Sequence, residues 1–171
     1  MNKQILFLLI IGTIFIGSSC EKKADSNEST SNSTSVTFKF ENQSDLNYWT
    51  QSAGGEAIID SGAVKFQNLT QCFHYETTNL IPVNNGESYI LKITGKVNES
   101  IQGDPGLCAG DFLIYIIQGS TNLIQTSFGN HPNWIIMSYS FVAASSAPIK
   151  IKFLIGTTRG AWIEKIELIK Q

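Results

Sequence analysis

Charged residues are scarce in this chain. They make up 15% of its 171 residues, against about 25% in typical globular proteins. The formal net charge is −2, and Arg159 is the only arginine. Nucleic-acid binding needs a clustered basic face, and sites that read phosphate commonly use arginine. The composition therefore predicts that the protein has no nucleic-acid partner.

Histidine is also scarce, and no familiar catalytic motif is present. His74 and His131 are the only histidines, and they lack the spacing of metal ligands. The chain contains no GxSxG, HExxH, P-loop or GxGxxG sequence. A glycosidase needs two facing carboxylates, and nothing in the spacing of Glu76, Asp104 and Asp111 selects such a pair. We predict a noncatalytic protein, and a small glycan hydrolase is the less favoured alternative.

Only one long apolar run is present, and it lies at the start of the chain. It covers residues 5–16, follows the positive charge of Lys3 and precedes the small residues Gly17 to Ser19. This order is typical of a secretory signal peptide. The run is shorter than the roughly 20 residues that span a bilayer. We predict that residues 1–19 are a signal peptide, and a transmembrane anchor is the alternative.

The small residues that end at Cys20 resemble the lipobox of bacterial lipoproteins. That resemblance implies that Cys20 carries lipid, including palmitate, and becomes the new N-terminus. Glu21 follows it, in place of the aspartate that resembles an inner-membrane retention signal. We therefore expect a lipid anchor in the outer membrane, on its surface or periplasmic face. Residues 20–35 are polar and rich in serine and asparagine, so we expect them to form a flexible linker.

The rest of the chain, residues 36–171, alternates apolar and polar residues with a period of two. Such alternation predicts strands with one buried face. The clearest cases are residues 36–40, 89–97, 135–142 and 149–155. Residues 112–117 are apolar on both faces, which predicts a covered central strand. Turn signals such as Ser61-Gly62 separate these runs, so we predict an all-β, two-sheet antiparallel sandwich.

Five features occur in a recognisable order along this domain. They are Phe40-Glu41 ahead of Trp49, the turn and strand from Ser61 to Phe66, the stretch from Ile81 to Tyr89, the strand from Trp134 to Phe141, and the closing strand from Trp162 to Leu168. The ordered set resembles the galactose-binding-like jelly rolls, especially the carbohydrate-binding modules of glycoside hydrolases, over nearly all of residues 36–171. The resemblance implies a jelly-roll fold and a glycan or other cell-surface ligand. It also implies a structural calcium ion, held at the positions that match Glu41 and Glu164.

The closing strand raises a separate question about Glu164. Simple alternation places Glu164 on the same face as Ile166 and Leu168, which are predicted core positions. A carboxylate on a core face is costly without a partner. A calcium ion shared with Glu41, a basic side chain or water at the end of the strand would each satisfy it.

Sugar binding needs aromatic faces and hydrogen-bonding groups. The candidate ligand-binding residues are Trp49, His74, Tyr75, Tyr115, Gln118 and Trp134, with His131 in a nearby loop. Core packing is the alternative for Trp49 and Trp134, because strands bury large aromatics. Simple exposure to solvent is the alternative for His74 and His131. A structural or adhesive lipoprotein that contacts protein is the alternative function.

Two cysteines remain once Cys20 is assigned to lipid. Cys72 and Cys108 both follow the signal peptide and would lie in an oxidising compartment. We predict that they form a disulfide, and two buried thiols are the alternative.

Overall fold

The computed structural model describes residues 35–69, 72–98, 112–156 and 160–171. The predicted signal peptide, Cys20, the linker up to residue 34 and Cys108 lie outside these residues. Within them, the chain forms strands and one short 3₁₀ helix, η1 (Gln43–Tyr48). No described helix has the length and apolar character needed to cross a membrane.

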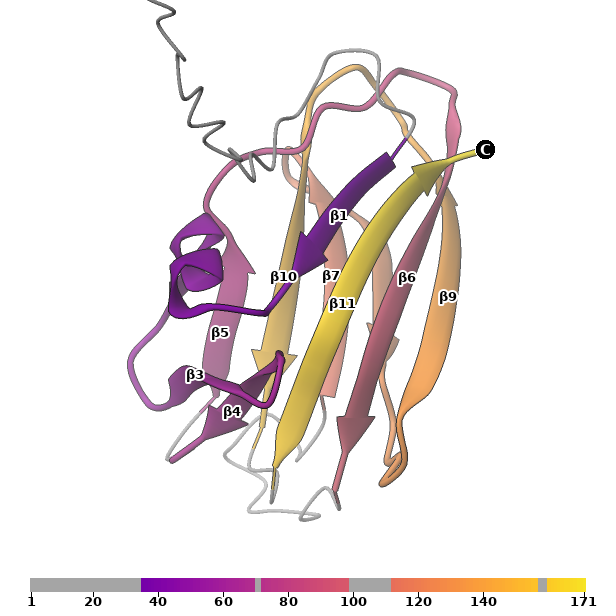
Figure 1. Ribbon diagram of the computed structural model, residues 1–171. Helices are drawn as coiled ribbons and strands as arrows, with labels where there is room; N and C mark the ends of the chain where they lie inside the picture. Colours follow the sequence, from indigo (N-terminus) through magenta and orange to yellow (C-terminus); the bar gives the residue numbers. More distant parts are fainter. Residues whose placement is uncertain (1–34, 70–71, 99–111, 157–159) are drawn as a thin grey trace, which may run out of the picture.

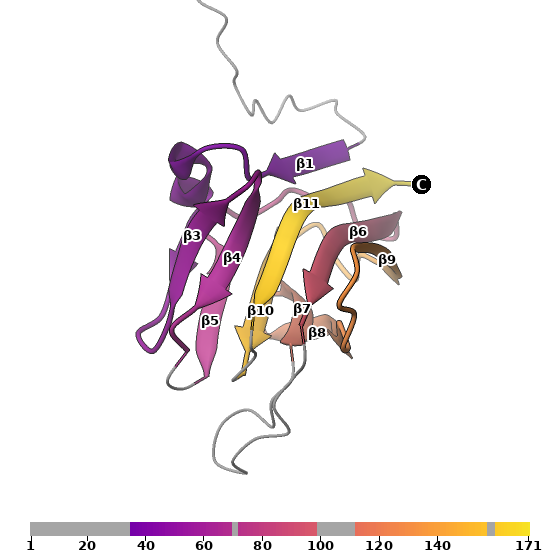
Figure 2. The same cartoon turned by 60° about the horizontal axis from the view of Figure 1, so that its bottom comes forward.

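Two antiparallel sheets face each other (Figures 1 and 2). The six-stranded sheet contains β1 (Ser35–Lys39), β3 (Glu56–Asp60), β4 (Ala63–Gln67), β6 (Ser88–Val97), β9 (Ile135–Val142) and β11 (Ala161–Lys170). The five-stranded sheet contains β2 (Trp49–Gln51), β5 (Phe73–Thr77), β7 (Phe112–Gln118), β8 (Thr121–Ser127) and β10 (Ile149–Ile155). The predicted two-sheet sandwich is therefore confirmed.

The long strand β11 organises the six-stranded sheet. β6 pairs with one edge of β11 along nearly its whole length. The other edge pairs first with β4, at Ala161–Ile163, and then with β1, at residues 165–169. β1 thus starts at Ser35, opposite Ile169, close to the C-terminus (Figure 1).

The five-stranded sheet runs in the order β2-β5-β10-β7-β8. β7 therefore lies between β10 and β8, as expected for an inner strand. Its outward side chains Leu113, Tyr115 and Ile117 are only half-buried. The prediction that both faces of this strand are covered was wrong, because no layer of the described chain packs on the outer face of the sheet.

The core between the two sheets contains an aromatic cluster around Trp49. Trp49 stacks on Tyr75 with the ring centroids 4.9 Å apart and the planes 4° apart. The rings of Phe38, Phe40 and Phe153 lie 5.3, 5.8 and 5.7 Å from the same indole. Aromatic pairs of this kind stabilise beyond the area that they bury. The cluster joins β1 of the six-stranded sheet to β2, β5 and β10 of the five-stranded sheet.

Two local features of the six-stranded sheet position the site described below. Ser61 and Gly62, with φ of 54° and 80°, form the turn between β3 and β4, as their sequence predicted. A two-residue hairpin turn with positive φ at both positions matches the twist of its strands. The second feature is a shift of register in β11 between Ile163 and Lys165, which is a β-bulge.

Candidate ligand-binding surface

Three of the predicted ligand residues belong to the interior of the sandwich. Trp49 is 6% exposed and Tyr75 is 2% exposed, and their rings cover each other. Burial raises the pKa of the Tyr75 hydroxyl. Neither ring has a face open to a sugar, so core packing, the alternative for Trp49, applies to both. Their assignment to a ligand site is corrected.

Gln118 is the third buried candidate. Its Nε2 donates to the carbonyl oxygen of Ser145 at 2.9 Å and to that of Ala147. Its Oε1 accepts the N–H of Ala144 at 2.9 Å. The amide is fully used in fixing the loop between β9 and β10. A role in ligand binding is therefore replaced by a structural one.

His74 and Tyr115 lie together on the outer face of the five-stranded sheet. Leu154 of β10 is paired with His74, and Lys152 of β10 is paired with Tyr115. Burial lowers the pKa of His74 below its ordinary value of 6.5, and the positive charge of Lys152 lowers it further. Beside them, the Glu76 carboxylate accepts from Lys150 Nζ at 2.9 Å. This face offers one half-buried tyrosine among paired charges.

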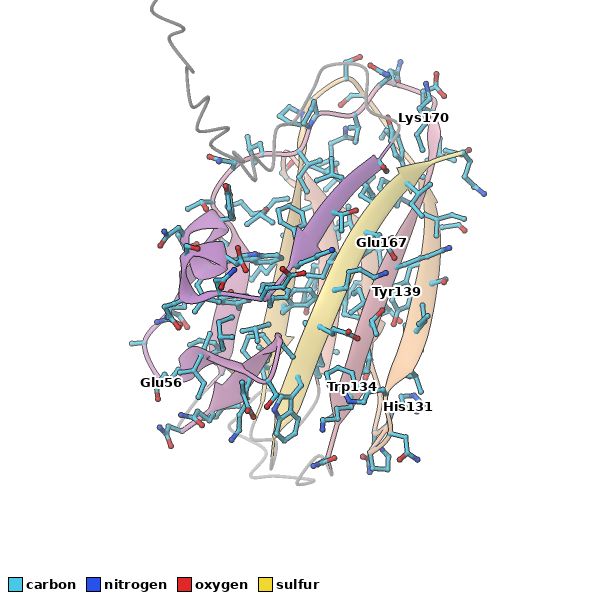
Figure 3. All side chains as sticks on the ribbon, viewed as in Figure 1. Glu56, His131, Trp134, Tyr139, Glu167 and Lys170 are labelled. Carbon is cyan, nitrogen blue, oxygen red and sulfur yellow. The ribbon has the colours of Figure 1, made fainter. Side chains whose placement is uncertain are left out.

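Trp134 lies on the opposite side of the molecule, on the outer face of the six-stranded sheet (Figure 3). It is 45% exposed and precedes β9, next to the pair between Gly95 and Ile135. The register pairs Trp162 of β11 with Lys65 of β4 on one side and with Lys96 of β6 on the other. Lys65, Trp162, Lys96 and Trp134 thus form one line across the strands, called here the tryptophan row.

The lysines of the tryptophan row lie against its indoles. Lys96 Nζ is 4.6 Å from the ring centroid of Trp162 and 5.0 Å from that of Trp134. Lys65 Nζ is 5.5 Å from the ring of Trp162. Ammonium groups at such distances are attracted to the negative face of the ring. The row alternates ammonium groups and indoles across β4, β11 and β6 and ends at Trp134, just before β9.

Trp162 is held in place by two further contacts. Its Nε1 donates to the Asp60 carboxylate at 3.1 Å, and this bond is the main cause of the lowered pKa of Asp60. Gly160 lies directly under the ring, because a Cβ added there would be 2.4 Å from the indole. Asp60 itself is positioned by the Ser61-Gly62 turn. The indole is thus oriented before any ligand arrives.

Sequence reasoning missed Trp162 because it treated β11 as a regular strand. Alternation placed Trp162 on the same face as Ile166 and Leu168. The bulge shifts that register, so Ile163 and Ile166 are both buried while Trp162 is half-exposed and Glu164 is exposed. The predicted core-facing Glu164 is therefore corrected, and its carboxylate needs no buried partner. The position of Trp162 between two lysines follows from the pairing of β11 with β4 and β6, which no local sequence pattern indicates.

The predicted calcium ligands lie near the junction of β1 and β11. Glu41 follows β1 and forms an ion pair with Lys39 at 3.5 Å, and Glu164 lies in the bulge. Calcium takes six to eight oxygen ligands. In the described parts of the chain, no three acidic, histidine or cysteine side chains group closely enough to hold a metal ion. The two carboxylates alone do not fit such an ion, and calcium stays a prediction.

Comparisons with known structures identify the fold. No family model and no curated protein matches this chain. A carbohydrate-binding module of family 4 is 12% identical with a TM-score of 0.56, covering 72% of this chain and 86% of its own. The C-terminal family 6 module of LamC, a marine laminarinase from Zobellia galactanivorans, is 13% identical with a TM-score of 0.55, covering 80% and 99%. A module from Cellvibrio mixtus lichenase 5A in complex with cellotriose is 8% identical with a TM-score of 0.53, covering 79% and 96%. The fold is the jelly-roll β-sandwich of these modules, as the sequence predicted.

Proposed function

We propose that this protein is a noncatalytic carbohydrate-binding protein whose ligand stacks on the tryptophan row. The observation that carries the proposal is the exposed indole of Trp134, aligned with the fixed indole of Trp162. Tryptophan offers a large apolar face, and the C–H surface of a pyranose ring is complementary to it. The neighbouring lysines and Asp60 supply hydrogen-bonding groups for sugar hydroxyls.

The fold comparisons support this proposal. The similar structures with this sandwich are carbohydrate-binding modules, and the structure of one of them contains cellotriose.

Replacing Trp134 by alanine is expected to weaken glycan binding at least about fivefold, as stacking on one aromatic ring contributes on the order of 1 kcal/mol or more. The measurement is a glycan array with the domain of residues 35–171, followed by calorimetric titration of the best ligand. The matched control is Tyr115→Ala, which removes an aromatic ring from the opposite face. Binding that survives Trp134→Ala but fails in Tyr115→Ala would move the site to the five-stranded sheet.

A protein-contacting adhesive function is the second candidate, and one observation favours it. Ile136, which is 65% exposed, lies on the outer face of β9 beside Trp134, which is 45% exposed. Exposed apolar patches commonly mark protein interfaces. Loss of a protein partner on Ile136→Ser, with no glycan bound by the native domain, would favour this function.

The anchoring that we propose for the chain is a lipid on Cys20 in the outer membrane. Cys20→Ala is expected to move the protein from the membrane fraction to the soluble fraction after export, because the chain would then lack its acyl groups. Fractionation and metabolic labelling with palmitate measure this directly. An uncleaved variant that stays in the membrane would show instead that residues 5–16 are a transmembrane anchor.

A further inference from the structure

The lysines of the tryptophan row differ from most of the other lysines of the domain. Lys39, Lys150, Lys165 and Lys170 each form an ion pair with a glutamate. Within the described residues, the ion pairs include neither Lys65 nor Lys96. These two ammonium groups lie instead against the rings of Trp162 and Trp134.

The row also carries an excess of positive charge. Asp60 is the carboxylate that bonds to the row, and one of its oxygens accepts from Trp162 Nε1. Both lysines act on Asp60 electrostatically and lower its pKa. Two ammonium groups against one carboxylate leave the row with one net positive charge. A carboxylate on the sugar would neutralise that charge, whereas a neutral sugar would not.

The placement of Lys96 sets where an anionic group would bind. Its Nζ lies between the two indoles, 4.6 Å and 5.0 Å from their centroids. A uronic acid carries its carboxylate on the edge of the pyranose ring. When such a ring stacks on Trp134, its carboxylate can reach the ammonium that lies against the same indole. Charge-assisted hydrogen bonds of this kind are stronger than neutral ones.

We propose that the tryptophan row recognises a carboxylated polysaccharide, one that contains uronic acid residues. The inference rests on the proposed function, since it names the class of sugar bound at the same site. Trp134 supplies the stacking surface, Lys96 pairs with the carboxylate, and Lys65 interacts with a second carboxylate farther along the polymer. The hydrogen bond from Trp162 Nε1 to Asp60 fixes the second indole in its position between the two lysines.

The experiment compares matched acidic and neutral polysaccharides. The domain of residues 35–171 is titrated with polygalacturonate, polymannuronate and glucuronoxylan, each beside its methyl-esterified form, and with a neutral β-glucan. At least one acidic form is expected to bind about tenfold more tightly than its ester. That preference is expected to shrink as salt is raised, because exposed charges are screened.

Lys96→Met tests the residue itself, since methionine keeps an apolar stem against both indoles. This variant is expected to lose most of the preference for the acid over its ester, while Lys152→Met on the opposite face keeps the native preference. Esters or neutral glucan that bind as tightly as the acids would overturn the inference and leave the proposed function standing. Absence of binding to every polysaccharide would overturn both. If the Lys96→Met variant kept the native preference for the acidic polysaccharides, the assignment of the site to this row would also be overturned.

Discussion

Trp49→Ala is expected to lower the free energy of unfolding by about 3–5 kcal/mol, the usual cost of removing a large aromatic from a core. The indole is 6% exposed and contacts the rings of Phe38, Phe40, Tyr75 and Phe153. The cavity left behind would remove the aromatic contacts that join β1 of the six-stranded sheet to β5 and β10 of the five-stranded sheet. Urea unfolding followed by circular dichroism measures the loss.

Two control variants separate core packing from ligand binding. Tyr75→Phe keeps the ring that stacks on Trp49, and the buried hydroxyl it removes has no hydrogen-bond partner in the described chain. Its stability is therefore expected to match or exceed that of the native domain. Trp134→Ala, at an exposed position, is expected to stay within about 1 kcal/mol. A Trp49→Ala domain that unfolds like the native one, yet loses glycan binding, would return Trp49 to the site.

Cys72→Ser is expected to cost about 3–4 kcal/mol of unfolding free energy if Cys72 and Cys108 are joined, the value for closing a loop of this length in the chain-entropy model. The sheet register favours this pairing. Phe73 and Phe112, which start β5 and β7, both pair with Ile155 of β10. Cys72 directly precedes Phe73, and Cys108 precedes Phe112 by four residues. Both cysteines thus lead into strands that start at the same end of one sheet.

The double variant Cys72→Ser/Cys108→Ser tests whether the two residues act as a pair. A disulfide predicts that the double variant is no less stable than either single variant, because each single change already removes the bond. Two independent buried thiols predict additive losses. Alkylation of both cysteines in the unfolded, unreduced domain, detected by mass spectrometry, would contradict the bond directly.

The strands could be predicted from sequence because their burial repeats every second residue. Val36 to Phe40, Tyr89 to Val97 and Ile149 to Ile155 each keep one apolar face toward the core. The Ser61-Gly62 turn was also readable, since only a few residues tolerate positive φ. Local sequence patterns were therefore enough to predict the two-sheet architecture.

The site was less readable because it depends on how distant strands align. The residues of the tryptophan row come from β4, β11, β6 and the segment before β9. No local sequence pattern indicates that these residues lie side by side across the sheet. The bulge at Glu164 adds one residue and inverts the alternation that sequence reasoning assumed. Aromatic residues were likewise ambiguous, since Trp49 and Trp134 differ in burial rather than in local pattern.

The pairing of β1 with β11 also determines how the domain would resist a pulling force. Ser35 lies opposite Ile169, whereas Trp162 lies seven residues away along the same strand, roughly 23 Å at the rise of an antiparallel strand. A pull between Ser35 and a polymer held at Trp162 would therefore run along the strands. The hydrogen bonds between β1 and β11 are perpendicular to that direction, so they would be loaded together in shear instead of opening one by one. Because forced unfolding is set by the unfolding rate, this arrangement would let a tethered domain keep its hold on a polysaccharide under flow.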